Sequence, residues 1–195
     1  MSASMRVVGV QVGSARKLAV GERTVLSAIH KTAVAGAVEV TALGLAGDEQ
    51  VDLSVHGGLE KAVYAYPSEH YAFWQAARHE AGVPASDTAQ PWGAIGENLT
   101  LRGLLETQVW VGDVLQFANC RLRVTQPREP CYKFNATMGM NSASKRMAQS
   151  GFCGFYLAVE QAGHLQAGEI FELVPGPRRV SIPERFTAKM QKHLR

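Results

Sequence analysis

Short runs rich in apolar and β-branched residues, separated by turn residues, make up much of this chain. The runs lie at residues 6–12, 37–43, 62–66, 108–117, 121–126, 156–161 and 169–174. Residues 121–124 alternate between charged and apolar side chains, which is the pattern of a strand with one buried face. Turn pairs such as Gly112-Asp113 interrupt the runs at short intervals. This spacing predicts a barrel or sandwich instead of a doubly wound parallel sheet.

Three helices are predicted between and after these strands, at residues 67–81, at residues 142–149 and in the tail beyond Ser181. Pro67 suits the first turn of the first helix, and Gly82 suits its end. Ser181 and Glu184 form a capping-box pattern at the start of the third helix. We therefore expect a mainly β fold with a few peripheral α-helices.

The composition adds limits to this picture. The chain has 195 residues, of which 46% are hydrophobic, so it is long enough to bury a core. The net charge of the chain is +3. Residues 175–195 contain six Lys or Arg and one Glu, so this segment has a charge of +5, and residues 1–174 have a charge of −2. We expect a folded domain at residues 1–175 and a basic tail with one helix at residues 176–195. The body lacks the basic stripe typical of nucleic-acid binding, so no nucleic-acid partner is expected.

Three cysteines and the absence of targeting patterns bear on location. No run of about 18 apolar residues predicts a membrane span, and the first residues do not form a signal peptide. An odd number of cysteines without a signal peptide predicts a reducing, cytoplasmic setting. No C-x-x-C pair is present, which argues against a structural zinc site.

One cysteine stands out within the stretch QPREPCYKF at residues 126–134. Cys131 lies between Arg128 and Lys133, and neighbouring cations favour the reactive thiolate form of a cysteine. A thiolate is both a nucleophile and a soft ligand for transition metals. The alternative is a small buried residue, the usual environment of a lone cysteine. That alternative suits Cys120 and Cys153 better, because neither has flanking cations.

A glycine-rich segment at residues 44–66 gathers polar side chains close together in the sequence. These are Asp48, Asp52, His56 and Lys61. Gly57 and Gly58 allow the backbone to approach a ligand, and free N–H groups there would hold an anion. A solvated connection between strands explains the same composition equally well.

Two further segments carry weaker signals. Glu97 and Asn98 follow a glycine and precede a possible strand, where a capped turn explains them better than a binding role if they are taken alone. Lys145 and Arg146 either reach an anionic ligand or form a solvated helix end.

These segments, taken in order, resemble the MOSC domain family, and within it the YiiM-type bacterial branch. The matching stretches are GLAGDEQVDLSVHGGLEKAVYAYPSEHYAFW, GAIGENLTLRGL, VWVGDVLQF, RLRVTQPREPCYKF and SGFCGFYLAVEQAGHLQAGE, which together span about residues 5–175. The resemblance implies a compact β-barrel with peripheral helices. It also implies the molybdenum cofactor (molybdopterin), a pterin dithiolene that carries a phosphate.

The resemblance assigns roles to particular residues. It makes Cys131 a candidate molybdenum ligand or persulfide carrier. The residues that it implies for cofactor binding are Asp48, His56, Gly57, Gly58, Lys61, Glu97, Asn98, Gln126 and Arg128, and the cations Lys133 and Arg146 are further candidates for the phosphate. A soft thiolate fits a molybdenum centre whose other ligands are sulfur, and cations with N–H groups fit a phosphate.

The first hypothesis for function, from this resemblance, is a molybdenum-dependent reductase of N-hydroxylated bases and related compounds. The chain has no flavin, haem or iron–sulfur motif, so a reductase needs an external electron-donor protein. The second hypothesis is a carrier of the cofactor, or of sulfur as a Cys131 persulfide, and the third is a metal-free cysteine-nucleophile enzyme. Longer YiiM-type members have a three-helix region after the barrel, whereas only residues 176–195 follow here. Whether the chain forms a homodimer, and whether it makes the partner contacts of that three-helix region, therefore stays open.

Overall fold

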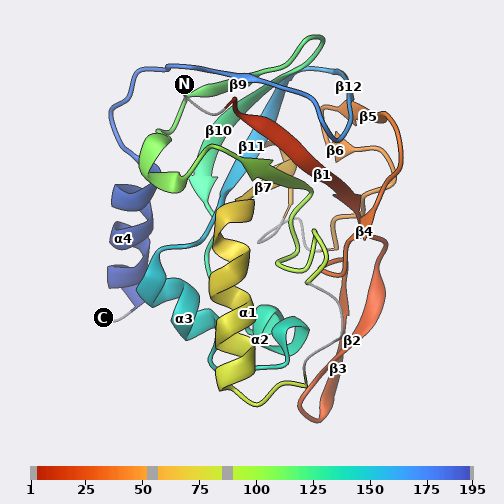
Figure 1. The fold of residues 1–195 in the computed structure, drawn as a ribbon, viewed down its shortest axis with the longest axis vertical. Coiled ribbons are helices and arrows are strands. Elements are labelled where there is room, and N and C mark those ends of the chain that lie inside the picture. Colours follow the sequence, from red (N-terminus) through yellow and green to blue (C-terminus); the bar gives the residue numbers. More distant parts are fainter. Residues whose placement is uncertain (1–3, 52–56, 85–89, 194–195) are drawn as a thin grey trace.

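A mixed sheet of eight strands forms the centre of the molecule in the computed structural model, which describes residues 4–51, 57–84 and 90–193 (Figure 1). In spatial order the strands are β13 (Glu172–Val174), β9 (Val114–Gln116), β10 (Arg121–Pro127), β11 (Phe155–Gln161), β7 (Val63–Pro67), β8 (Leu99–Arg102), β1 (Arg6–Val12) and β4 (Thr32–Ala33). Neighbouring strands run antiparallel except β7 and β8, which are parallel.

The two ends of this sheet approach each other. Val7 of β1 donates its N–H to the carbonyl of Glu169 at 2.9 Å, and Phe171 donates to the carbonyl of Met5 at 3.2 Å. The connection consists of one isolated bridge, between Arg6 and Ile170, together with these flanking bonds. The prediction of a mainly β fold with peripheral helices is confirmed, while a fully closed barrel stays a prediction.

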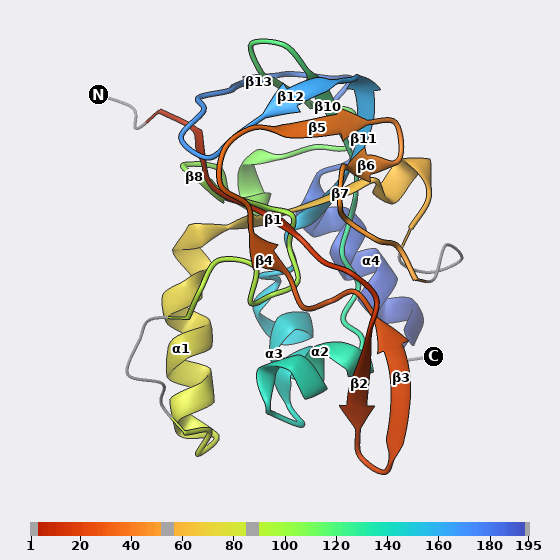
Figure 2. The ribbon, with the colours of Figure 1, turned by 90° about the vertical axis from the view of Figure 1, so that its right-hand side faces the viewer.

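Two smaller sheets extend the fold. One has the order β12 (Gly163–Leu165), β5 (Val38–Thr41) and β6 (Gly44–Leu45). The other is a hairpin of β2 (Arg16–Val20) and β3 (Arg23–Ser27), which projects from the body in Figures 1 and 2. The apolar runs did not reveal this hairpin, because Leu18 is the only residue of β2 that is buried.

Within the described residues, four α-helices lie outside the large sheet, one more than the sequence pattern predicted. They are α1 (Tyr71–Glu80), α2 (Tyr132–Met138), α3 (Ala143–Ser150) and α4 (Ile182–His193). The short 3-10 helices are η1 (Leu59–Lys61), η2 (Ser68–His70) and η3 (Glu106–Gln108). In Figures 1 and 2, α1, α2 and α3 gather at one end of the sheet.

Helix α2, which the sequence pattern did not predict, follows Cys131 directly. Pro127 is the last residue of β10, and Pro130 lies in the short connection that follows it. The helix begins directly after Cys131, which is its N-cap residue. The prolines therefore confine the irregular backbone to residues 128–131 and do not extend it further.

The predicted strand at residues 108–117 is also corrected. Only Val114–Gln116 forms a strand there, and a turn at Gly112 separates it from η3. Asp113 is fully buried in that turn, where its carboxylate accepts the N–H groups of Trp110 and Gly176. A buried carboxylate that satisfies loop N–H groups favours the turn over a continuous strand.

The aromatic face predicted for the first helix packs into the core. Tyr71, Trp74 and Ala77 are the buried residues of α1. Trp74 donates its indole N–H to the hydroxyl of Tyr66 at 2.6 Å, and its ring meets Phe134 of α2 edge-on at 5.1 Å. This packing joins α1 and α2 to β7 and fixes the end of the sheet where Cys131 lies.

The basic tail is docked on the body. Helix α4 packs against β10 and η3, with Ile182 fully buried and Phe186 almost so. The predicted capping box is present, because Ser181 donates its N–H to the Glu184 carboxylate at 2.8 Å. Residues 176–195 thus contribute a packed helix. Within the described part of the chain, no helix has the length and apolar character needed to cross a membrane.

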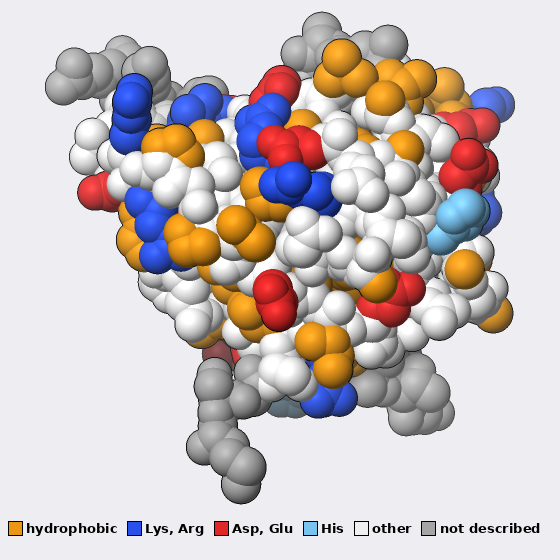
Figure 3. Space-filling model, turned by 90° about the horizontal axis from the view of Figure 1, so that it is seen from above, with side chains coloured by type: hydrophobic (Ala, Val, Ile, Leu, Met, Phe, Trp, Pro, Cys, Tyr) orange, Lys and Arg blue, Asp and Glu red, His pale blue; other side chains and the backbone are white. Residues whose placement is uncertain are grey.

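Acidic and basic side chains lie beside one another on the face shown in Figure 3. On β10, Arg123 pairs with Glu60 at 3.0 Å and with Glu160 at 3.2 Å. Figure 3 shows basic side chains interspersed with acidic and uncharged ones, and not one basic stripe. That nucleic acid is not a partner stays a prediction.

Candidate functional site

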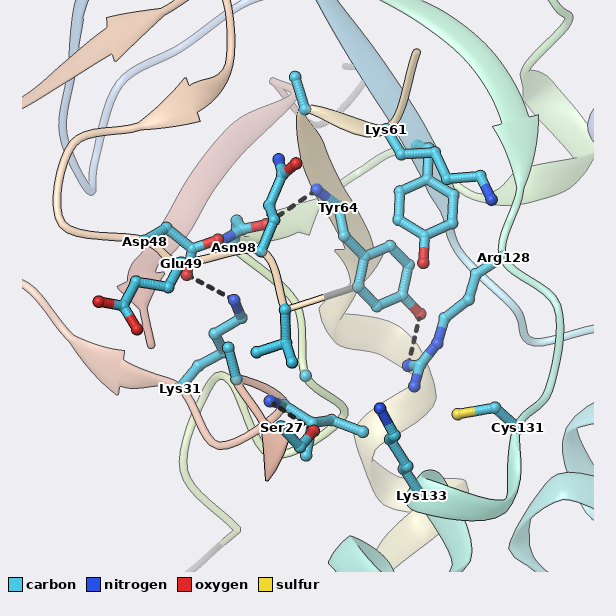
Figure 4. A pocket seen from close by; sticks show the side chains of 17 residues that line it. Ser27, Lys31, Asp48, Glu49, Lys61, Tyr64, Asn98, Arg128, Cys131 and Lys133 are labelled. Atoms are coloured by element: carbon cyan, nitrogen blue, oxygen red, sulfur yellow. Dashed lines mark hydrogen bonds and ion pairs between the residues drawn. The ribbon is translucent and has the colours of Figure 1, made fainter. Parts of the chain in front are cut away.

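A pocket at the end of the large sheet brings together segments that are far apart in the sequence (Figure 4). Its empty volume is about 660 Å³ when the open mouth is included. Its walls include Ser27 of β3, Asp48 after β6, Tyr64 of β7, Asn98 before β8 and Cys131 before α2. Cys131 is thus part of a pocket to which at least five segments contribute.

The backbone of Cys131 is held from two sides. The Cys131 carbonyl accepts the hydroxyl of Ser144 in α3 at 2.7 Å, and the N–H of Phe134 at 3.0 Å. The residue itself has extended dihedral angles, φ −138° and ψ 158°. Its side chain is half-buried and lines the pocket. Contacts from α2 and α3 therefore fix the backbone that carries the thiol.

Arg128 is a buried cation beside this thiol. The residue is 4% exposed, and its guanidinium lies 4.9 Å from the ring centre of Tyr64 and 5.0 Å from that of Phe134. It donates to the carbonyl of Ile95 at 2.5 Å and to the Tyr64 hydroxyl at 3.4 Å. Burial alone would lower the pKa of this guanidinium, yet the facing Tyr64 and Cys131 raise it overall. Arg128 therefore stays charged.

Two lysines extend the positive side of the pocket. The Lys61 ammonium lies 5.7 Å from the ring centre of Tyr156, and Lys133 donates to the carbonyl of Leu26 at 3.4 Å. Figure 4 shows Lys133 and Arg128 on the same side of the pocket as the Cys131 sulfur. The thiol thus lies in an electropositive part of the pocket, as the flanking cations in the sequence indicated.

The opposite wall carries the acidic side chains of the pocket (Figure 4). The Asp48 carboxylate accepts the Lys31 ammonium at 2.5 Å and the N–H of Gly13 at 2.7 Å. Glu49 accepts the N–H of Ala15 at 2.6 Å. Asp48 and Lys31 are both buried at their side chains, at 7% exposure each. The pocket is therefore polarised, with cations near the thiol and carboxylates facing them.

Asn98 lines the pocket, but its side chain is engaged in holding strands together. Its carbonyl oxygen accepts the N–H of Tyr64 at 3.0 Å, and its amide group donates to the carbonyl of Gln11 at 3.2 Å. These bonds join β7 and β1 beside the start of β8. Asn98 thus shapes the wall of the pocket next to the point where the pairing of β7 with β8 begins.

Two tyrosines on adjacent strands form the floor of the positive side. Tyr64 of β7 and Tyr156 of β11 stand opposite each other in the sheet, with ring centres 5.3 Å apart. Burial raises the pKa of Tyr156 to about 12 and raises the pKa of Tyr64 well above its usual value, although Arg128 opposes both shifts. Both phenols are therefore neutral near pH 7 and present O–H groups next to Arg128.

Five predicted binding residues that the structure describes do not line this pocket, and they are Gly57, Gly58, Glu97, Gln126 and Arg146. Gln126 accepts a hydrogen bond from Lys189 at 3.1 Å, and Arg146 pairs with Glu80 at 2.9 Å. Of the two readings of Arg146, the structure favours a surface helix residue. His56 lies outside the described residues.

Glu97 is a buried structural carboxylate. It is fully buried and accepts hydrogen bonds from the Tyr71 hydroxyl, the Thr100 hydroxyl, and the N–H groups of Gly93 and Ile95. Burial raises the pKa of Glu97, and these donors oppose that shift. The reading as a capped turn therefore describes its side chain better than direct contact with a ligand.

The glycine pair is also used differently from the expectation. Gly58 has a φ of 87°, in the region that favours glycine, and precedes η1. Its N–H donates to the side chain of Gln50 at 2.8 Å, so this group is not a free anion donor. Gly58 instead precedes η1, whose last residue, Lys61, does line the pocket.

Sequence reasoning missed Lys31, Tyr64 and Tyr156. The two tyrosines lie in runs that were correctly predicted as strands, but a strand pattern does not tell which side chains face a pocket. Lys31 is a single lysine after β3, and its partner Asp48 lies 17 residues further along the chain. Only the folded arrangement brings them together.

The other two cysteines are buried, as predicted. Cys120 and Cys153 are fully buried and free. Burial raises the pKa of the Cys120 thiol to about 11 and that of Cys153 well above its usual value. Among the described residues, no group of three or more His, Cys, Asp or Glu side chains is arranged to hold a metal ion. Cys131 is therefore the one described cysteine that borders the pocket.

The MOSC domain family model matches residues 52–172, more than half of the chain. The chain belongs to the MOSC domain family. It is 37% identical to protein YiiM of Escherichia coli K12, over 81% of this chain and 68% of that protein. It is 33% identical to the uncharacterized protein YflK of Bacillus subtilis, over 96% of this chain and 80% of that protein. These similarities place this MOSC protein in the YiiM-type branch of the family.

Solved structures agree with this assignment. The MOSC protein described here superposes on YiiM from Geobacillus stearothermophilus with a TM-score of 0.75 and 32% identity, over 96% of this chain and 85% of that chain. For YiiM from Escherichia coli the TM-score is 0.68 and the identity 27%, over 90% and 76% of the two chains.

A fungal relative is much longer. A protein of Gibberella moniliformis named "Reductase" is 33% identical over 86% of this chain, yet the match spans only 29% of the fungal protein. The MOSC segment is therefore one part of that larger polypeptide.

Proposed function

We propose that this MOSC protein binds the molybdenum cofactor and reduces N-hydroxylated bases and related compounds, with Cys131 as the metal ligand. The observation that carries the proposal is the position of Cys131, which is half-buried in a pocket next to the charged guanidinium of Arg128. Thiolate ligands suit soft or sulfur-rich metal centres, whereas oxygen ligands suit magnesium and calcium.

The buried charge of Arg128 supports an anionic occupant. Among the described residues no carboxylate pairs with Arg128, whose guanidinium contacts a backbone carbonyl, a phenol hydroxyl and two aromatic rings. A buried cation without a counter-charge is costly, and an anionic ligand would compensate it. The molybdenum cofactor carries a phosphate and dithiolene sulfurs, so Arg128, Lys133 and Lys61 fit such a ligand chemically.

The residues of the chain would divide the work. The cofactor supplies two-electron redox chemistry, while the protein supplies placement and electrostatics. Cys131 would hold the metal through its sulfur. Two hydrogen bonds to its carbonyl fix the backbone at this residue and so restrict where the sulfur lies. Tyr64 and Tyr156 would remain protonated and offer O–H groups on the floor of the pocket. The Asp48–Lys31 pair would hold the facing wall in place.

The reductase part of the proposal has support from the fungal relative, which is named a reductase. Most of that protein lies outside the part that matches this chain. A reductase that consists of the MOSC part alone would obtain electrons from another protein. We therefore propose an external electron-donor reductase as a partner, in a cytoplasmic setting.

The test is metal and pterin analysis of the protein purified from a host that makes the cofactor. Stoichiometric molybdenum and pterin, lost in Cys131→Ala but kept in Cys120→Ser and Cys153→Ser, is the expected result. Cofactor retained unchanged in Cys131→Ala would exclude Cys131 as an essential ligand. Reduction of an N-hydroxylated purine with an artificial electron donor then separates an enzyme from a carrier. A fully loaded protein without this activity would favour a carrier of the cofactor or of persulfide sulfur.

A further inference from the structure

The C-terminal helix reaches the segment that carries Cys131. The Lys189 ammonium on α4 donates to the side-chain oxygen of Gln126 at 3.1 Å and also to the carboxylate of Glu129. The two acceptors lie on either side of Arg128, and Glu129 is two residues before Cys131. One side chain from the end of the chain thus bridges two points of the pocket segment.

Helix α4 provides a fixed base for this bridge. Ile182 and Phe186 are buried against the core, and the N–H of Ile182 donates to the carbonyl of Val109 at 2.9 Å. Ser181 and Glu184 cap the first turn. Lys189 lies one turn beyond Phe186 along the helix. Its position relative to β10 is therefore set by the packed first half of α4.

Side-chain and backbone contacts from several elements hold the bridged segment. It connects the end of β10 at Pro127 with the start of α2 at Tyr132. Pro127 and Pro130 have no backbone N–H, so neither residue can donate to a strand ladder or a turn. The bonds to the Cys131 carbonyl hold the end of this connection, Arg128 holds it from inside, and Lys189 holds it from outside.

We propose that Lys189 is a positioning residue that holds the segment from Gln126 to Cys131 in the geometry that presents Arg128 and the thiol to the pocket. Lys189 does not line the pocket, so it acts through the segment it binds. Its importance for catalysis rests on the proposed function, whereas its effect on the segment does not. The C-terminal helix is in this view part of the site and not an appendage.

The number of acceptors distinguishes this bridge from an ordinary surface ion pair. Exposed single pairs contribute little to stability because solvent screens them and long side chains lose freedom. Here the side chain of Lys189 is 24% exposed and that of Glu129 is 36% exposed. The ammonium also has two acceptors on one short segment, which restrains the segment more than one contact would.

The experiment compares the full-length Lys189→Met variant with the wild type, both without added cofactor. Methionine keeps the aliphatic stem and the helix propensity but removes the ammonium. Hydrogen exchange of the peptide that contains residues 126–134 and alkylation of Cys131 by iodoacetamide, followed by mass spectrometry, are measured at one fixed pH. Both rates are expected to rise by about threefold in the variant, with an unchanged melting temperature.

Three controls isolate the bridge. Thr187→Ala changes an exposed residue on the same helix and should leave both rates unchanged. Lys189→Arg restores a cation and should return both rates to the wild-type value. Glu129→Gln combined with Lys189→Met should be no worse than Lys189→Met alone, because the two changes remove the same contact.

Exchange and alkylation rates in Lys189→Met equal to those of the wild type would overturn the proposal. A rise that Thr187→Ala reproduces would also overturn it, since the effect would then belong to the helix in general. These readouts need neither molybdenum nor substrate. A protein that fails to bind the cofactor but shows the expected rates would refute the proposed function and leave the positioning role intact.

Discussion

Arg128 donates a hydrogen bond to the Tyr64 hydroxyl at 3.4 Å, and its guanidinium lies 4.9 Å from the centre of the same ring. This buried pair places a planar cation between a strand of the sheet and the loop that carries Cys131. A lysine at this position would keep the charge but not the planar fork that contacts the Ile95 carbonyl, the ring and the hydroxyl together. Arginine and lysine are therefore not interchangeable at position 128.

We expect Arg128→Lys to fold and to retain the molybdenum cofactor about tenfold more weakly, a factor that corresponds to about 1.4 kcal/mol. The measurement is the pterin and molybdenum content after dialysis, together with the melting temperature of the cofactor-free protein. Arg146→Lys is the matched control, because Arg146 lies outside the pocket and pairs with Glu80. Equal cofactor loss in both variants would contradict a specific role for Arg128.

The three thiols should differ sharply in reactivity. Cys131 is half-buried at the pocket, whereas Cys120 and Cys153 are fully buried. Burial raises the pKa of Cys120 to about 11, so little reactive thiolate forms there near neutral pH. Native protein should accept one equivalent of iodoacetamide at pH 7, on Cys131, and denatured protein should accept three. Label on Cys153 in the native state would show that the described packing opens readily.

The sequence pattern predicted the strand-rich fold because alternating apolar residues reflect burial of one face. It predicted the Cys131, Arg128 and Lys133 cluster because these residues are neighbours along the chain, so their proximity does not depend on the fold. It did not predict α2, since the prolines that flank the connection also occur in irregular backbone. The hairpin of β2 and β3 was missed because its side chains are mostly exposed.

The rest of the pocket depends on distant contacts. Lys31 and Asp48 meet only because β3 and β6 lead to the same wall, and no local pattern records that. Glu97 and Asn98 are adjacent in the chain, yet Asn98 lines the pocket while Glu97 turns into the core. Sequence alone gives the polar character of such a pair but not the direction in which each side chain points.

Glu97 should make stability depend on pH. Burial raises the pKa of this carboxyl above its usual value of 4.5, so the folded protein binds the proton more tightly than the unfolded chain. The stabilisation from this group is complete below pH 4.5 and is lost as the pH rises through the folded pKa. Glu97→Gln does not titrate, and its amide N–H₂ would face N–H donors, so we expect a loss of about 1–3 kcal/mol.

Urea unfolding of wild type and Glu97→Gln at several pH values measures this effect. The difference in unfolding free energy should be largest at low pH and should narrow as the pH rises. Thr107→Ser, at an exposed position, is a control that should give a small and constant difference. A gap that widens with rising pH would mean that Glu97 is ionised in the folded protein and that its four donors outweigh burial.

The C-terminal helix should contribute to the stability of the whole domain. Phe186 is 4% exposed and packs with Ile182 against the core beneath β10 and η3. Phe186→Ala removes most of a buried aromatic side chain, and such changes cost about 3–5 kcal/mol when the cavity does not collapse. Thermal unfolding should show one transition at a lower temperature, with Thr187→Ala unchanged as the control. A separate early transition of α4 with an unshifted main transition would instead show that the helix detaches without weakening the domain.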